Sequence, residues 1–90
     1  MKIEFTDHAW EDFGYWSDND PDIILRTKSL LLSIQESPFK GLGKPEPLKH
    51  NLKGFWSRRI TGEHRLVYKV SGKKGVDLKC SIVSCRFHYD

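Results

Sequence analysis

The sequence contains few cysteines and no long hydrophobic run. Its 90 residues include two cysteines and one methionine, and 30% of them are charged. A membrane-spanning helix needs about 20 consecutive, mostly apolar residues, and this chain has no such stretch. No signal-peptide pattern is present either, so nothing indicates export, and free thiols suit a reducing compartment. We therefore expect a cytoplasmic protein with no membrane-spanning segment.

Several kinds of site are also missing. Two lone cysteines make no zinc site, and the four histidines show no metal-ligand spacing with cysteines or carboxylates. There is no glycine-rich phosphate loop of the Walker or Rossmann type. Cys80 and Cys85 are an odd number of residues apart on what reads as one strand, so they should face opposite sides of a sheet without bridging. The sequence predicts neither a metal site nor a cofactor.

The two signs of charge occupy different halves of the chain. Residues 1–37 hold three Lys or Arg and eight Asp or Glu, a net charge of −5. Residues 38–90 hold twelve and four, a net charge of +8. Such asymmetry favours a polyanionic partner, although a solvated cationic face is the plainer alternative. The chain is short and has no internal linker, so we expect one domain spanning residues 1–90.

Two amphipathic helices are predicted in the acidic half. Thr6 or Asp7 can cap the first helix, and Asp20 followed by Pro21 is a typical start for the second. The second helix should end before Pro38. The apolar stripe of the first helix, which we expect to be buried, comprises Ala9, Trp10, Phe13 and Trp16. The stripe of the second comprises Ile23, Thr27, Leu30, Leu31 and Ile34.

The remaining segments alternate with a period of two, which is typical of strands. Strands are predicted at residues 3–5, 56–60, 64–70 and 76–87. Residues 38–47 contain glycines and prolines and read as a loop, Gly62 marks a tight turn, and residues 71–75 form a basic hairpin loop. The expected fold is α+β, with two N-terminal helices packed on one face of a mainly antiparallel, twisted sheet.

Alternation also predicts which side chains share a face. The core face should carry Leu66, Tyr68, Val70, Val83, Cys85 and Phe87. Trp56, Arg58 and Ile60 should lie on this face as well, opposite the exposed residues. The exposed face should carry Arg65, Val67, Lys69, Ile82, Ser84, Arg86 and His88, joined by Ser57 and Arg59. One polar, cationic sheet face is the result.

Four sequence blocks carry a resemblance to a known family. They are KPEPLKHNL at residues 44–52, FWSRRI at 55–60, EHRLVY at 63–68 and CRFHY at 85–89. These blocks resemble the YoeB (Txe/YoeB) branch of the RelE-like bacterial toxins, and the similarity extends over nearly the whole chain. The resemblance implies a RelE-like fold and a metal-free endoribonuclease that cleaves mRNA in the ribosomal A site, on the 30S subunit of the 70S ribosome. It also implies a YefM-like antitoxin partner and allows a homodimer. Two departures are Asp90 after the usual terminal tyrosine and a longer loop at residues 71–75.

The resemblance assigns roles to individual residues. Glu46, between two prolines, matches the general base, Arg65 matches the phosphate-stabilising arginine, and His88 matches the general acid. Supporting contacts to substrate are expected from Lys49, Arg59 and Tyr89, and His50 lies close enough in sequence to touch RNA. These residue types suit the chemistry, because metal-free cleavage needs a base for the 2′-OH, an acid for the leaving oxygen and cations for the phosphorane.

Other readings stay open for the same residues. Taken alone, Glu46 reads as a solvated loop carboxylate, Arg65 as a surface cation and His88 as a frayed terminal residue. A catalytically silent RelE/ParE-fold protein that acts through contacts with the ribosome, the antitoxin or another protein is the main alternative. A third possibility is an RNA-binding partner whose effect requires only the basic face.

Overall fold

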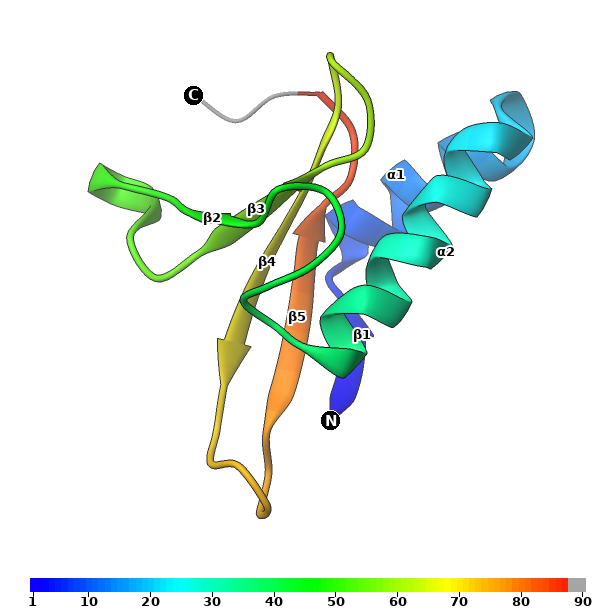
Figure 1. The fold of residues 1–90 in the computed structure, drawn as a ribbon. Helices are drawn as coiled ribbons and strands as arrows, with labels where there is room; N and C mark the ends of the chain where they lie inside the picture. Colours follow the sequence, from blue (N-terminus) through cyan, green and yellow to red (C-terminus); the bar gives the residue numbers. More distant parts are fainter. Residues whose placement is uncertain (88–90) are drawn as a thin grey trace.

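The computed structural model describes residues 1–87 and shows two helices against one face of a twisted, five-stranded sheet (Figure 1). The elements in chain order are β1 (Lys2–Phe5), α1 (Asp7–Asn19), α2 (Pro21–Glu36), β2 (Glu46–Pro47), the 3₁₀ turn η1 (His50–Leu52), β3 (Trp56–Arg59), β4 (Arg65–Ser71) and β5 (Lys79–Ser84). The strand order is β1-β5-β4-β3-β2, and β1 runs parallel to β5 while the other neighbours are antiparallel. The expected α+β fold is confirmed.

Both helices begin where the sequence predicts, and α2 ends before Pro38 as expected. The Thr6 hydroxyl accepts a hydrogen bond from the Ala9 amide at 3.2 Å and caps α1. The Asp20 carboxylate accepts one from the Ile23 amide at 3.3 Å, and Pro21 occupies the first position of α2. These caps satisfy amides that have no partner within a helix. None of the helices in residues 1–87 is long and apolar enough to cross a membrane.

The main core lies between the helices and the sheet. It is a cluster of buried residues comprising Ala9, Trp16, Ile23, Leu30, Ile34, Ile60, Leu66, Tyr68, Cys80, Ile82 and Cys85. The prediction that Trp10 is buried is wrong, because its side chain is 63% exposed. The sheet ends at β1, so Trp10 packs only at the rim, stacked on Phe13 with ring centroids 5.9 Å apart.

A bulge in β5 changes the alternation of its side chains. Tyr68 pairs with Ile82, but the preceding residue Val67 pairs with Ser84, so Val83 is an extra residue on β5. An extra residue in one strand shifts every later side chain to the other face. The sequence pattern alone gives no sign of this shift.

The bulge overturns several predicted positions. Cys80 and Ile82 before it and Cys85 after it are all fully buried in the main core. The predictions that Ile82 is exposed and that the two cysteines face opposite sides are therefore wrong. Phe87, expected in the core, is 55% exposed beyond the end of the strand. Both cysteines are free thiols, as predicted.

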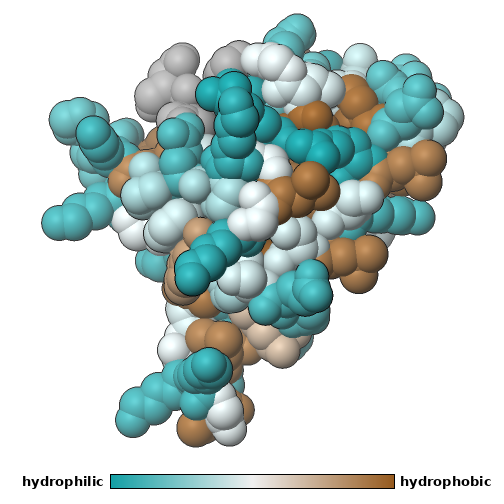
Figure 2. Space-filling model, viewed as in Figure 1, coloured by the Kyte–Doolittle hydropathy of each residue, from teal (hydrophilic) through white to brown (hydrophobic). Residues whose placement is uncertain are grey.

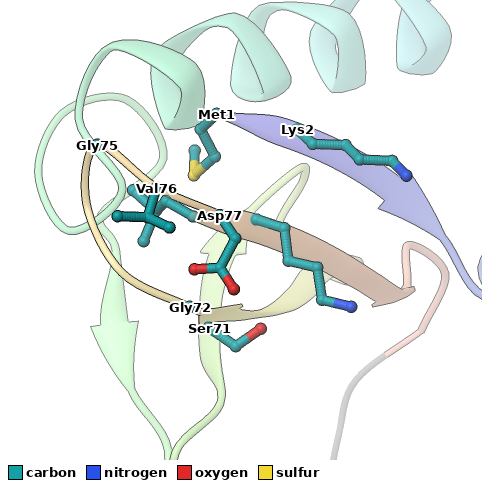
Figure 3. Close-up of a pocket in the computed structure, with 9 residues that line it drawn as sticks. Met1, Lys2, Ser71, Gly72, Gly75, Val76 and Asp77 are labelled. Carbon is teal, nitrogen blue, oxygen red and sulfur yellow. The ribbon is translucent and has the colours of Figure 1, made fainter.

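The hairpin between β4 and β5 is longer than predicted, because β5 starts at Lys79 rather than at Val76. Gly72 has φ +88°, and a Cβ there would lie 2.4 Å from the Asp77 carbonyl oxygen, so the turn requires glycine. This hairpin and the first two residues of the chain line a hollow of about 750 Å³ (Figure 3). Its lining contains none of the predicted site residues that the structure describes.

The end of the predicted loop 38–47 is a short strand. Glu46 pairs with Ser57 and Pro47 with Trp56, so β2 forms the edge of the sheet. Proline tolerates an edge because it has no amide to donate to a further strand. The expectation of a loop through Pro47 is wrong for these two residues, and the sheet register now fixes the position of Glu46.

The outer face of the sheet is less polar than predicted. Ser57 and Val67 alternate onto that face, yet both are buried, and Leu48 after β2 is buried as well. Elsewhere the surface mixes both kinds of residue, and Figure 2 shows hydrophobic side chains scattered among hydrophilic ones rather than gathered in one large patch. The main apolar interior is therefore the helix–sheet core.

Candidate active site

Sheet register places three of the predicted site residues on one face. Glu46 is directly opposite Ser57, and Arg59 is directly opposite Arg65. Directly paired residues share a face, and so do Ser57 and Arg59, which are two residues apart on β3. Strand spacing of about 4.8 Å and a rise of about 3.3 Å per residue put the Cα atoms of Glu46 and Arg65 roughly 12 Å apart. Two long side chains can close on a phosphate across that span.

The pairing of Arg59 with Arg65 is unfavourable in itself, because like charges directly opposite on a sheet repel each other. Arg65 Nη1 donates to the Thr61 carbonyl at 2.9 Å, which fixes one side of the guanidinium. The Arg59 carbonyl accepts from Arg26 Nη2 at 3.2 Å. Two cations on one sheet face favour an anion between them, and guanidinium groups suit phosphate because they are planar and stay charged.

Lys49 and His50 lie close to Glu46. Residues 46–52 line a hollow of about 260 Å³, to which all three side chains belong. Glu46, Lys49 and His50 are exposed, so a ligand can reach them. The structure thus brings together the predicted base and two of the predicted supporting residues.

Residues with a left-handed backbone lie at or near the candidate site residues. The three non-glycine residues with positive φ in the described chain are Lys44 at 52°, His50 at 58° and Phe87 at 64°. Each is within two residues of a candidate site residue. Such conformations cost about 1–3 kcal/mol apiece and gather at functional sites, where the surrounding structure holds them in place.

Helix α1 anchors the chain that leads to the C-terminus. The indole Nε1 of Trp16 donates to the Cys85 carbonyl at 2.7 Å, and Asp12 Oδ2 accepts from the Cys85 amide at 3.0 Å. Both contacts are buried. Arg86, the next residue, stacks on the ring of Tyr15 with its Cζ 3.5 Å from the ring centroid. The end of the sheet is therefore tied to α1 by three side chains.

His64 fixes the next residue of this segment. Its Nδ1 accepts from the Phe87 amide at 2.7 Å, and the Arg65 amide donates to the Phe87 carbonyl at 3.1 Å. Accepting at Nδ1 places the proton of the neutral ring on Nε2, which lies 3.6 Å from Glu63 Oε1. The imidazole also packs edge-on against Trp16, with centroids 4.6 Å apart. These contacts give His64 a structural role.

His88 and Tyr89, predicted as general acid and supporting residue, lie outside the described residues, as does Asp90. In residues 1–87 no three His, Cys, Asp or Glu side chains form a group that could hold a metal ion. The predicted catalytic residues within the described part of the chain are Glu46 and Arg65.

Sequence reasoning missed the anchors of the site. Arg58 is fully buried, and Asp12, Trp16 and His64 hold the C-terminal segment. One signal was available for Arg58, because alternation places this charged residue on the core face of β3. A charge at a core position needs several hydrogen-bond partners.

Comparisons with known proteins agree with this architecture. Residues 5–89 match the family model described as YoeB-like toxin of bacterial type II toxin-antitoxin system. Toxin YoeB of Escherichia coli K12 is 48% identical over 89 residues, covering 99% of this chain and 100% of the relative. A solved YoeB/ParE toxin from Agrobacterium tumefaciens has a TM-score of 0.93 at 44% identity, covering 99% of this chain and 100% of that one.

Two solved structures from Staphylococcus aureus show assemblies of such a toxin. One is a YoeB dimer, with a TM-score of 0.86 and 42% identity, and the other is a heterotetrameric YoeB-YefM toxin-antitoxin complex, with a TM-score of 0.85 and 42% identity. Both alignments cover 99% of this chain and 98% of the other. With the match over residues 5–89, the chain belongs to the YoeB-like toxins of bacterial type II toxin–antitoxin systems.

Proposed function

We propose that this toxin is a metal-free endoribonuclease that cleaves mRNA in the ribosomal A site. The observation that carries the proposal is the common sheet face of Glu46, Arg59 and Arg65, set by the pairing of β2, β3 and β4. A carboxylate and two guanidiniums around one space suit an RNA phosphate and its neighbouring 2′-OH.

In this mechanism Glu46 takes the proton from the ribose 2′-OH, and the oxygen attacks the adjacent phosphorus. Arg65, helped by Arg59, stabilises the charge that develops on the phosphorane oxygens. His88 gives a proton to the departing 5′-oxygen, so the bond from phosphorus to that oxygen breaks. The products are a 2′,3′-cyclic phosphate and a 5′-hydroxyl. Lys49, His50 and Tyr89 are proposed to hold the RNA.

Partners and location follow from the same proposal. A YefM-like antitoxin would restrain the toxin, and the YoeB-YefM complex of the S. aureus relative supports such a partner. We expect this antitoxin to cover the basic sheet face. A homodimer is a second assembly to test, given the dimer of that relative. We place the action on ribosomes in the cytoplasm, and the family match over residues 5–89 supports one toxin domain spanning 1–90.

The test separates catalysis from binding. Cleavage of mRNA on stalled ribosomes is compared for wild type, Glu46→Gln and Arg65→Met, with ribosome cosedimentation as the second readout. A general base contributes roughly 10²–10⁴-fold, so Glu46→Gln should lose at least 100-fold in rate while still binding ribosomes. Lys28→Gln, an exposed charge on α2, is the control and should cleave normally. Tight binding by wild type without cleavage would instead favour the catalytically silent binding protein.

A further inference from the structure

Arg58 is a fully buried cation with a complete set of hydrogen bonds. It lies on β3, and its side chain enters the core beside Tyr68. The five partners are Tyr68 Oη (3.1 Å) on Nε, Ser33 Oγ (2.7 Å) and the Leu42 carbonyl (3.0 Å) on Nη1, and the Ser37 (2.7 Å) and Lys40 (2.9 Å) carbonyls on Nη2. A guanidinium has five N–H groups, so each finds an acceptor.

Three of these partners are carbonyls of one loop. Residues 37, 40 and 42 all belong to the connection between α2 and β2, which ends at Glu46. Neighbouring contacts close the same loop. The Leu42 amide donates to Ser33 Oγ at 3.1 Å, and the Tyr68 hydroxyl donates to the Pro38 carbonyl at 2.7 Å. Burial raises the pKa of Tyr68 in spite of the nearby Arg58, which favours the protonated hydroxyl that this bond requires.

Two glycines let the loop pack directly on its anchor. Gly41 and Gly43 have φ of +109° and +86°. A Cβ on Gly41 would lie 2.6 Å from Ser33 Oγ, and one on Gly43 would lie 2.7 Å from Leu30 Cδ2. The Gly43 carbonyl accepts from the Arg59 amide at 2.7 Å, which ties the loop to β3 just before Glu46 enters β2. The loop is therefore packed tightly between the Arg58 guanidinium and strand β3.

A lysine could not replace this guanidinium. Lysine offers three donors from one nitrogen, whereas the five acceptors here surround three nitrogens of a planar fork. Loop carbonyls without a donor would be partly buried and unpaired, and the loop would move to hydrate them. Because the chain from Leu42 to Glu46 is short, such a movement reaches the candidate base directly.

We propose that Arg58 is a positioning residue that sets the place of Glu46 by gathering the 37–43 loop. The inference rests on the proposed ribonuclease function for its effect on cleavage. Displacing a reacting group by about 1 Å can cost roughly 100-fold in rate. We therefore expect Arg58→Lys to lower the turnover rate about 100-fold, with little change in the ribosome concentration that gives half-maximal rate.

Two variants test the same loop from other sides. Ser33→Ala removes one of the five acceptors and leaves Arg58 in place, so it should fold and show a smaller loss, about 10-fold by the same reasoning. Gly43→Ala pushes the loop away from Leu30 and β3 without removing any partner of Arg58. Lys53→Gln, at an exposed residue directly after η1, is a matched control and should behave like wild type.

The structural readout is amide hydrogen exchange. If Arg58 holds the loop, the amides of Leu42 and Arg59 exchange faster in Arg58→Lys, while those of Leu66 and Ile82 stay protected. In Ser33→Ala the Arg59 amide is the readout, because Ser33 Oγ is itself the acceptor of the Leu42 amide. Faster loop exchange together with a slower turnover rate supports the proposal. Unchanged loop exchange in both variants overturns the anchoring, and loosened loops with full turnover overturn the positioning of Glu46. If wild type does not cleave at all, the ribonuclease proposal fails, but the exchange data still decide whether Arg58 anchors the loop.

Discussion

Replacing Arg65 with lysine keeps the positive charge and removes the guanidinium geometry. In the described part of the chain, the side-chain hydrogen bonds of Arg65 all use Nη1, at 2.9 Å to the Thr61 carbonyl, 3.3 Å to Gly62 and 3.2 Å to His64. We propose that Nε and Nη2 present a pair of parallel donors to a phosphate. A single ammonium group cannot hold the turn carbonyls and also present two parallel donors to the substrate.

The expected loss of cleavage rate follows from these two uses of the guanidinium, one for the turn carbonyls and one for the phosphate. Losing a preorganised donor to a transition-state oxyanion costs about 2.7–4 kcal/mol, or roughly 10²–10³-fold in rate. Lysine retains the charge, so we expect about half of that energy to be lost, which is roughly 10–30-fold. Arg65→Met, which also removes the charge, should lose the full 10²–10³-fold.

The assay is single-turnover cleavage of a ribosome-bound mRNA at saturating toxin, so that binding does not limit the rate. Circular dichroism and urea unfolding would check that each variant is folded and so can keep the backbone pairing of residue 65 with Arg59. Arg65→Lys cleaving as fast as wild type would refute the bidentate role of the guanidinium.

Three further predictions concern the scaffold. Burial raises the pKa of Cys80 from 9.0 to about 11 and that of Cys85 from 9.0 to about 12, so the folded state holds these protons more tightly than the unfolded chain. The resulting stabilisation is complete below about pH 9 and is lost as the pH rises toward 11 and 12. The free energy of unfolding measured in urea should therefore fall from pH 8 to pH 10.5. A free energy of unfolding that stays level over this range would contradict the prediction. Trp16→Phe leaves the buried Cys85 carbonyl without its 2.7 Å donor and should lower the free energy of unfolding by about 1–3 kcal/mol. An unchanged unfolding curve would contradict this prediction. Gly72→Ala should lower the free energy of unfolding more than Gly75→Ala. Both glycines have positive φ (+88° and +82°), but only a Cβ on Gly72 would meet other atoms. Equal losses of stability in the two variants would contradict this prediction.

Local rules predicted the helices and the shared face of the arginines well. Helix caps depend on one side chain and an amide three residues away, so Thr6 and Asp20 could be identified from neighbouring residues alone. Alternation along β3 and β4 is uninterrupted, so Arg59 and Arg65 appear on the same face, as expected.

Features that depend on contacts between distant segments could not be predicted in the same way. The bulge at Val83 is a shift in the pairing of β5 with β4. The alternation of side chains along β5 alone gives no sign of it. The role of Arg58 needs partners between residues 33 and 68, whose approach depends on the finished fold. The base candidate Glu46 read as part of a loop because strand β2 is two residues long and contains proline, which weakens any strand pattern.

The chemistry of the RNA ends tests the central claim most directly. Wild-type toxin, Glu46→Ala and His88→Ala would each be incubated with translating ribosomes, and the ends of the cleaved mRNA would be identified. The mechanism requires a 2′,3′-cyclic phosphate or 3′-phosphate on one fragment and a 5′-hydroxyl on the other, with both variants at least 100-fold slower. Fragments with a 5′-phosphate, or intact mRNA on ribosomes that hold the wild-type toxin tightly, would contradict it.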